Sequence, residues 1–292
     1  MDCITRKAYA KINLGLDVLR RRPDGYHEVK MIMQTVDIWD LLTFKRADRP
    51  GIFIKTDKEE LPAGKDNLIY KAAEAILQEY HRETEGVEIT LEKNIPIAAG
   101  MAGGSTDAAA VFYGLNELFE IGMSLQDMQR IGVRLGADIP YCLLGGTALA
   151  EGIGEKLTPL GPPPKCHLVV ARPEISVSTR FVYENLHADQ LKEHPDIDGM
   201  TEAIREGNLA GLTGRMGNVL ETVTVRAYPA IDQIKKKMME NGAENALMSG
   251  SGPSVFGIFT EKQRAAGAAE EIRRAGLAEQ VFVTEYKSPE TA

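Results

Sequence analysis

Hydrophobic and polar positions along the chain follow two periodicities, one typical of strands and one typical of helices. Large apolar and β-branched residues, or strict alternation, predict strands at 10–19, 27–36, 41–45 and 87–92. The Pro-Asp-Gly between the first two predicts a turn. Apolar residues at helical spacing predict an amphipathic helix over 67–80, capped by Asp66 or Asn67.

Strands and helices alternate through the rest of the chain. The expected helices are 105–119, 124–135, 179–186, 225–241 and 263–275, with a cap at Ser124. The expected strands are 166–171, 246–248, 255–259 and 280–286. Because this alternation lacks the regular spacing of a doubly wound parallel sheet, we predict an α+β fold with two domains. Four prolines fall within nine residues at 157–165, so we expect domains 1–160 and 161–292.

Composition narrows the class of protein. The 292 residues include 43% hydrophobic and 26% charged side chains, and 34 basic against 42 acidic groups give a net charge of −8. An acidic chain is a poor general partner for nucleic acid or anionic membrane, so we expect neither. The odd set Cys3, Cys142 and Cys166 lacks a CxxC pair, and no apolar stretch is long enough to span a bilayer, which favours a cytoplasmic protein.

The most informative segment is the glycine-rich stretch PIAAGMAGGSTDAAA at 96–110. Glycine permits positive φ and close approach of a ligand, and a helix N-terminus offers free N–H groups, so the segment suits a polyphosphate. Ser105 and Thr106 are candidate helix caps whose hydroxyls can also reach phosphate or its Mg²⁺. A plain strand-to-helix turn is the alternative. A GxxxxGK[ST] loop is absent, and the stretch after the helix does not form the next strand of a dinucleotide-binding unit.

Together with other motifs, this loop resembles the GHMP kinase superfamily. The further motifs are AYAKINLGLDV at 8–18 and LMSGSGPSVFGIF at 247–259. RPDGYHEV at 22–29 and LGADIPYCLLGGTALAEGIGE at 135–155 are similar to the branch whose acceptor is a cytidine diphosphate-linked methylerythritol. The resemblance spans nearly the whole chain and is weakest across 184–221. Met101, where leucine is usual, and the pair Thr106-Asp107 are conservative departures.

The resemblance implies a two-domain GHMP kinase fold. Its N-terminal domain, here 1–160, is a mixed sheet-and-helix ATP-binding domain that carries the glycine-rich phosphate loop. Its C-terminal domain, here 161–292, is a ferredoxin-like α+β domain. The implied reaction moves the γ-phosphoryl group of ATP, bound with Mg²⁺, to the 2-hydroxyl of the acceptor, in the non-mevalonate route to isoprenoid precursors.

Two residues match the catalytic groups of the family. Asp138 matches the general base, and Lys11 matches the lysine that pairs with it and stabilises charge on the hydroxyl and phosphoryl oxygens. An ammonium beside a carboxylate keeps it ionised and able to accept a proton. Without the resemblance, Asp138 could merely shape a turn and Lys11 could lie on the solvated face of a strand.

The resemblance also implies two sets of binding residues. The ATP set is Pro96, Ile97, Ala98, Ala99, Gly100, Met101, Ala102, Gly103, Gly104, Ser105, Thr106, Asn67, Leu68 and Lys93. The substrate set is Asn13, Tyr26, His27, Tyr183, Gly250, Ser251 and Gly252. In this scheme the histidine recognises the cytosine edge and the tyrosines stack on its faces, because imidazole can donate and accept at once. The alternatives are a helix cap at Asn67, a strand-end lysine at Lys93, a hairpin at 22–29 and a plain β-turn at 249–252.

Two other functions stay open from the sequence. One is another small-molecule kinase of the superfamily, acting on homoserine, mevalonate or galactose, which the PDGYH segment disfavours. The other is a non-catalytic nucleotide-binding module, which the presence of both Lys11 and Asp138 disfavours. The expected partners are small molecules, and the chain is expected to be a monomer or a homodimer.

Overall fold

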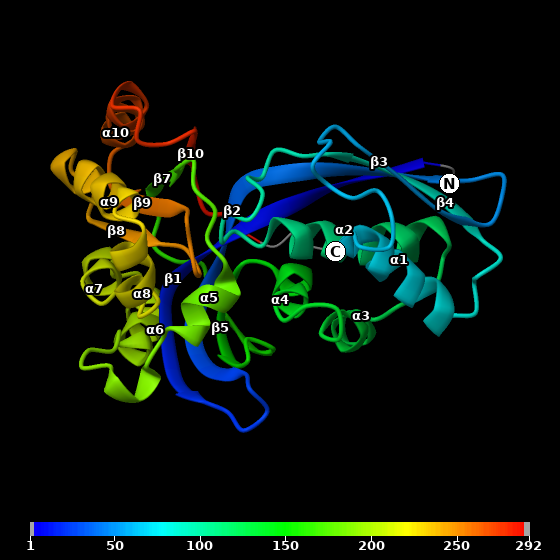
Figure 1. Ribbon diagram of the computed structural model, residues 1–292, viewed down its shortest axis with the longest axis horizontal. Helices are drawn as coiled ribbons and strands as arrows, with labels where there is room; N and C mark the ends of the chain where they lie inside the picture. The colour runs from blue at the N-terminus through cyan, green and yellow to red at the C-terminus, as the bar shows by residue number, and fades with distance from the viewer. Residues whose placement is uncertain (1–2, 289–292) are drawn as a thin grey trace. The chain divides into compact units, whose positions relative to one another are not determined.

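The computed structural model describes residues 3–288, which form two compact units (Figure 1). Among these residues, unit 1 contains 3–10, 38–97 and 102–144, and unit 2 contains 11–37, 98–101 and 145–288. The two longest strands, β1 (Cys3–Arg21) and β2 (His27–Arg46), contribute residues to both units. The α+β prediction is confirmed, whereas 27–36 and 41–45 are parts of one strand.

Unit 1 packs four helices against strands. Within it, β2 pairs antiparallel with β4 (Gly86–Glu92), and β4 pairs parallel with β3 (Gly51–Thr56). The helices are α1 (Leu68–Glu79), α2 (Gly103–Leu118), α3 (Leu125–Gly132) and α4 (Ile139–Leu144). Figure 1 shows them gathered on one side of the strands, and apolar side chains from both layers form one buried core.

Unit 2 contains a hairpin and a four-stranded sheet. The hairpin strands are β5 (Thr147–Gly152), which pairs with β2, and β6 (Lys156–Leu160). The sheet strands are β7 (His167–Arg172), β8 (Asn245–Met248), β9 (Val255–Phe259) and β10 (Gln280–Thr284). Their order is β10-β7-β9-β8 with every pair antiparallel, which is the expected ferredoxin-like arrangement.

The helices of unit 2 connect these strands. They are α5 (Thr179–Glu184), a 3₁₀ turn (Ala188–Gln190), α6 (Ile197–Arg205), α7 (Leu209–Thr213), α8 (Glu221–Ala227), α9 (Ala230–Glu240) and α10 (Lys262–Arg274). Helices α9 and α10 pack against the sheet. The single helix predicted over 225–241 is wrong: Pro229 separates α8 from α9, because proline lacks the N–H group that continues a helix.

Local signals explain where the predicted helices begin. Asn67 caps α1, since its side chain accepts a hydrogen bond from the Ile69 N–H at 2.9 Å. Ser124 caps α3 through a capping box with Asp127. The structure adds elements that the pattern missed, namely β3, β5, β6, α4, α6 and α7.

The proline-rich stretch 157–165 does not separate the compact units. Strand β6 ends inside it, and both compact units include segments from before residue 160. A boundary at residue 160 between the two family domains stays a prediction. Over residues 3–288, every helix is too short or too polar to cross a membrane.

The core of unit 1 offers a test of its packing. Phe44 of β2 is fully buried and contacts α2 at Gly114, where a Cβ atom would lie 2.5 Å from the phenyl ring. Phe44→Ala removes that ring, and we expect a loss of about 3–5 kcal/mol in the free energy of unfolding, measured by urea denaturation. Phe53→Ala on β3 is the control, because Phe53 is only half-buried and its loss should be smaller. Equal losses would contradict this assignment of the core.

Candidate functional site

The glycine-rich loop ends at the uncapped N-terminus of α2. Ala98, Gly100 and Ala102 have φ values of 51°, 73° and 56°, so the backbone takes the left-handed conformation at three alternate residues. Ala102 is the N-cap of α2, and it forms no side-chain cap hydrogen bond within the described chain. The first N–H groups of α2 are therefore available to an anion, and the helix dipole favours negative charge there.

Ser105 and Thr106 do not cap this helix, so that prediction is wrong. Gly103 and Gly104 already adopt helical dihedrals, which places both hydroxyl residues inside the first turn. The Thr106 hydroxyl donates to the Tyr9 carbonyl at 2.7 Å and is buried, whereas Ser105 is half-buried. The Thr106 N–H donates to the Ala102 carbonyl at 2.9 Å, so both of its donors are engaged, and a phosphate contact of Thr106 stays a prediction.

Lys93 directly follows β4 and lies in a buried charge cluster. Its ammonium donates to Asp107 Oδ2 at 2.8 Å and pairs with Asp40 Oδ2. Burial alone would lower the pKa of Lys93, but the two carboxylates outweigh it and raise that pKa, so the ammonium keeps its proton. Burial and the nearby Asp40 charge hold the pKa of Asp107 well above its ordinary value, because one ammonium cannot neutralise two carboxylates.

Two other residues of the predicted ATP set lie at the start of α1. Asn67 uses its side-chain oxygen as the cap and donates through its amide nitrogen to the Pro62 carbonyl at 2.7 Å. Leu68 is half-buried and packs against the core of unit 1. The helix-cap interpretation of Asn67 is confirmed, and a nucleotide contact there stays a prediction.

Asp138 lies in the turn directly before α4. Its carbonyl accepts the N–H of Cys142 at 3.0 Å, and its side chain is half-buried. Within the described part of unit 1, no hydrogen bond or ion pair engages its carboxylate. The group is therefore partly screened from water and open to a partner, as a proton acceptor requires.

Lys11 and Asn13 lie on β1 in unit 2, both buried. The Lys11 ammonium donates to Asn13 Oδ1 at 2.7 Å, and the Asn13 amide nitrogen lies 3.2 Å from the sulfur of Met31. The Lys11 backbone N–H donates to the Met101 carbonyl at 3.1 Å. The solvated-face alternative for Lys11 is therefore wrong, since Asn13 orients its buried ammonium.

The SGSGP loop lies beside these residues. Ser249 Oγ donates to the Gly100 carbonyl at 2.9 Å. A Cβ atom on Gly100 would lie 2.3 Å from the Ser249 carbonyl oxygen, so only glycine fits this approach. A Cβ atom on Gly250 would lie 3.6 Å from both Lys11 Nζ and Asn13 Oδ1. The structure thus brings together the middle of the glycine loop, Lys11, Asn13 and Gly250.

Asn218 is a supporting residue that the sequence analysis missed. Its amide nitrogen donates to the carbonyls of Met248 and Gly250, each at 2.8 Å, and its oxygen accepts the Leu220 N–H at 3.0 Å. It is buried and bridges to Leu16 of β1. It falls in the stretch where the family resemblance is weakest, so only its buried partners reveal its role as a brace for the SGSGP loop.

The predicted substrate set includes the rings of Tyr26, His27 and Tyr183, and the structure brings two of them together. The rings of His27 and Tyr183 lie 5.0 Å apart at 39°, whereas Tyr26 is 59% exposed. Burial, helped by the positive charge of Arg21, lowers the pKa of His27. Its imidazole is therefore neutral at physiological pH, with one donor and one acceptor. Ser251 Oγ lies 2.8 Å from the hydroxyl of Thr179, the first residue of α5.

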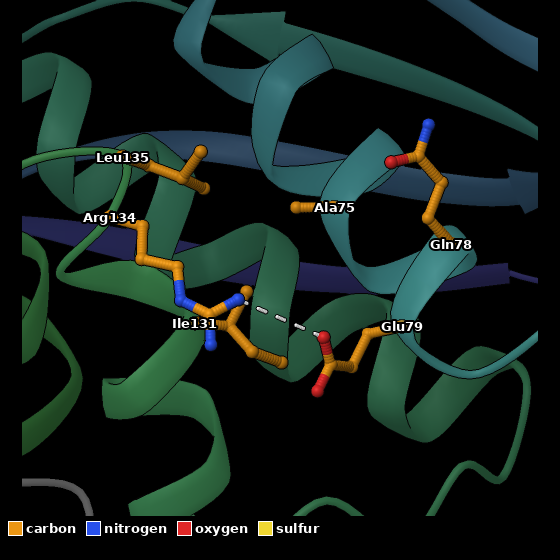
Figure 2. Close-up of a pocket in the computed structure, with 6 residues that line it drawn as sticks. All are labelled: Ala75, Gln78, Glu79, Ile131, Arg134 and Leu135. Atoms are coloured by element: carbon orange, nitrogen blue, oxygen red, sulfur yellow. Dashed lines mark ion pairs between the residues drawn. The ribbon is translucent and has the colours of Figure 1, made fainter.

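A separate cavity of about 260 Å³ lies between α1 and the end of α3 (Figure 2). Figure 2 shows its lining residues, which are Ala75, Gln78, Glu79, Ile131, Arg134 and Leu135. Arg134 and Glu79 form an ion pair at 4.0 Å. None of the predicted site residues lines this cavity.

The chain is similar to known proteins over nearly its whole length. The model for the GHMP kinases N terminal domain matches residues 67–146, and that for the GHMP kinases C terminal matches residues 200–278. Proteins named 4-diphosphocytidyl-2-C-methyl-D-erythritol kinase from Lachnoclostridium phytofermentans and Lachnospira eligens are each 51% identical to this chain. The first alignment covers 98% of both chains, and the second covers 99% of this chain and 100% of its relative.

Solved structures agree with this result. A crystal structure of 4-(cytidine 5'-diphospho)-2C-methyl-D-erythritol kinase superposes with a TM-score of 0.83 at 33% identity, over 98% of this chain and 100% of the other. A homoserine kinase from Cytophaga hutchinsonii has a TM-score of 0.80 at 21% identity, over 99% and 96% of the two chains, and shares the fold. On these identities and coverages, the chain belongs to the 4-diphosphocytidyl-2-C-methyl-D-erythritol kinase family of the GHMP kinases.

Proposed function

We propose that the chain transfers the γ-phosphoryl group of ATP to the 2-hydroxyl of 4-diphosphocytidyl-2-C-methyl-D-erythritol, with Asp138 as general base assisted by Lys11. Its membership in a kinase family makes it a phosphotransferase. The structural observation that best supports ATP binding is the uncapped N-terminus of α2, at the end of a loop in which three residues have left-handed backbone conformations. Such a terminus binds phosphate through backbone N–H groups.

The proposed chemistry needs little beyond positioning and charge stabilisation. The acceptor hydroxyl attacks the γ-phosphorus, an oxygen–phosphorus bond forms, the bond to ADP breaks, and the hydroxyl proton passes to the Asp138 carboxylate. Lys11 stabilises negative charge on the attacking and transferred oxygens. Asn13 supports this role, because its hydrogen bond at 2.7 Å holds the Lys11 ammonium in one orientation.

Acceptor selection is assigned to the aromatic residues. A neutral His27 presents one donor and one acceptor, which matches the N3 acceptor and amino donor of cytosine. Tyr26 and Tyr183 supply rings for stacking. Gly250, in the Gly250–Ser251–Gly252 turn, lies next to Lys11 and Asn13 and adds no side-chain bulk there. This arrangement favours a cytidyl acceptor over homoserine, mevalonate or galactose.

ATP is proposed to enter as its Mg²⁺ complex. Residues 96–106 would bind the phosphates, and Asn67, Leu68 and the Lys93 segment would lie toward the base and ribose. Among residues 3–288, no group of three His, Cys, Asp or Glu side chains is arranged to hold a metal. The proposal includes a cytoplasmic location, a monomer or homodimer, and family domains that meet near residue 160.

An acceptor-specificity assay tests this function. The purified chain is given ATP and Mg²⁺ with the cytidyl methylerythritol, its uridyl analogue, mevalonate, homoserine or galactose, and ADP release is measured. We expect turnover on the cytidyl acceptor alone. Turnover on another acceptor would support a different GHMP kinase, and ATP binding with no turnover on any acceptor would support the non-catalytic alternative.

Asp138→Asn tests the general base. The amide keeps the shape of the side chain but accepts a proton poorly, so we expect kcat to fall by about 10²–10⁴-fold with ATP affinity unchanged. Steady-state kinetics and calorimetric ATP binding provide the two measurements. Asp232→Asn on α9, outside the predicted site, is the matched control. Normal turnover of Asp138→Asn would remove this residue as the base.

The lowered pKa of His27 predicts an acid limb in the pH profile. A base with a lowered pKa is neutral above that value, so cytosine recognition is complete at neutral pH and is lost as the ring gains a proton. As the pH is lowered, we expect kcat/KM for the cytidyl acceptor to fall, with its midpoint below pH 6.5, the ordinary pKa of histidine. KM for ATP should change little over the same range. His27→Gln keeps a donor and an acceptor but does not titrate. An unchanged acid limb in this variant would assign the limb to another group.

A further inference from the structure

The buried cluster of Lys93, Asp40 and Asp107 joins three elements of unit 1. Asp40 lies on β2, Lys93 directly follows β4, and Asp107 lies in the second turn of α2. Their exposed fractions are 0%, 6% and 3%. Residues this deeply buried are placed by one another rather than by solvent, so the cluster holds these elements in one arrangement.

The ammonium of Lys93 lies directly against the first residue of α2. A Cβ atom on Gly103 would lie 2.9 Å from Lys93 Nζ and 3.1 Å from Ile95 Cγ2. Side chains do not pack that closely, so the absence of a Cβ atom lets the ammonium approach the helix backbone. Lys93 thus contacts the turn whose free N–H groups are proposed to bind phosphate.

Asp40 extends the cluster to the backbone that leads into the loop. Its Oδ1 accepts the N–H groups of Asn94 at 2.6 Å and Ile95 at 2.7 Å, while Oδ2 pairs with Lys93. Asp57 Oδ1 accepts the Lys93 N–H at 2.9 Å. The exit from β4 is therefore fixed at three consecutive residues before Pro96.

We propose that Lys93 is a positioning residue for the phosphate-binding turn, and that its side chain does not contact the base or ribose of ATP. Moving the ammonium toward a nucleotide would leave two buried carboxylates without a counter-charge, which is strongly unfavourable. The inference rests on the proposed function only in that the N-terminus of α2 receives the phosphates. It also gives Gly103 a second role, as the residue that lets the ammonium contact the helix.

Comparing two ligands separates positioning from direct contact. Inorganic tripolyphosphate carries the phosphates of ATP without base or ribose. In Lys93→Met, the side chain stays long and unbranched but loses its charge. Positioning then predicts that the affinities for ATP and tripolyphosphate fall by the same factor, about tenfold, in calorimetry of the full chain. A contact with base or ribose predicts a loss for ATP alone.

A second variant controls for a loss of binding that is caused by misfolding. Lys93→Met leaves Asp40 and Asp107 buried without a counter-charge, whereas Lys93→Met/Asp107→Asn removes one charge of each sign and leaves Asp40 with two N–H donors. The double variant should show the same parallel loss. Lys71→Met, which replaces an exposed lysine of α1, is the matched control and should bind both ligands normally.

Every outcome of this experiment either supports the positioning role of Lys93 or contradicts it. Parallel losses support it, whereas a loss confined to ATP, no loss for either ligand, or a wild type that does not bind tripolyphosphate overturns it. The test does not depend on the acceptor. A wild type that binds both ligands but does not phosphorylate the cytidyl methylerythritol overturns the proposed function and leaves the inference standing.

Discussion

The burial of a carboxylate in the middle of a long strand constrains much of unit 1. Asp40 has no exposed surface, and it is stable there because Lys93 and two backbone N–H groups satisfy its oxygens. With that charge compensated, β2 continues without a break from His27 to Arg46. The same contacts fix the end of β4, and through Asp107 they fix α2. The Lys93 ammonium therefore helps to hold β2, the segment that follows β4 and helix α2 in place.

Sequence periodicity predicted those elements whose signals are local. Asn67 and Ser124 mark the starts of α1 and α3 because each bonds to residues two or three positions away. The continuity of β2 could not be predicted in the same way. Carboxylates at 37 and 40 are typical of an exposed break, and the lysine that makes Asp40 tolerable lies 53 positions further along the chain. The start of α2 was misplaced because two helical glycines precede its hydroxyl residues.

The candidate site likewise contains residues that sequence motifs predict and a residue that they do not. Motif resemblance selected Lys11, Asn13 and Gly250, and the structure brings them together within unit 2. It could not select Asn218, whose partners are the carbonyls of residues 30 and 32 positions away. A net charge of −8 likewise says little about anion binding. Backbone N–H groups at a helix terminus contribute no formal charge, so an acidic chain can still bind a polyphosphate.

The left-handed conformation at Ala98 and Ala102 has a thermodynamic consequence. A left-handed alanine is disfavoured by roughly 1–2 kcal/mol, so the folded chain stores strain at both positions. Glycine would relieve that strain, but it would also let the loop sample many more backbone states. Since alanine samples fewer, less conformational entropy is lost when a ligand arrives. The chain thus gives up some global stability for a loop that is preorganised before binding.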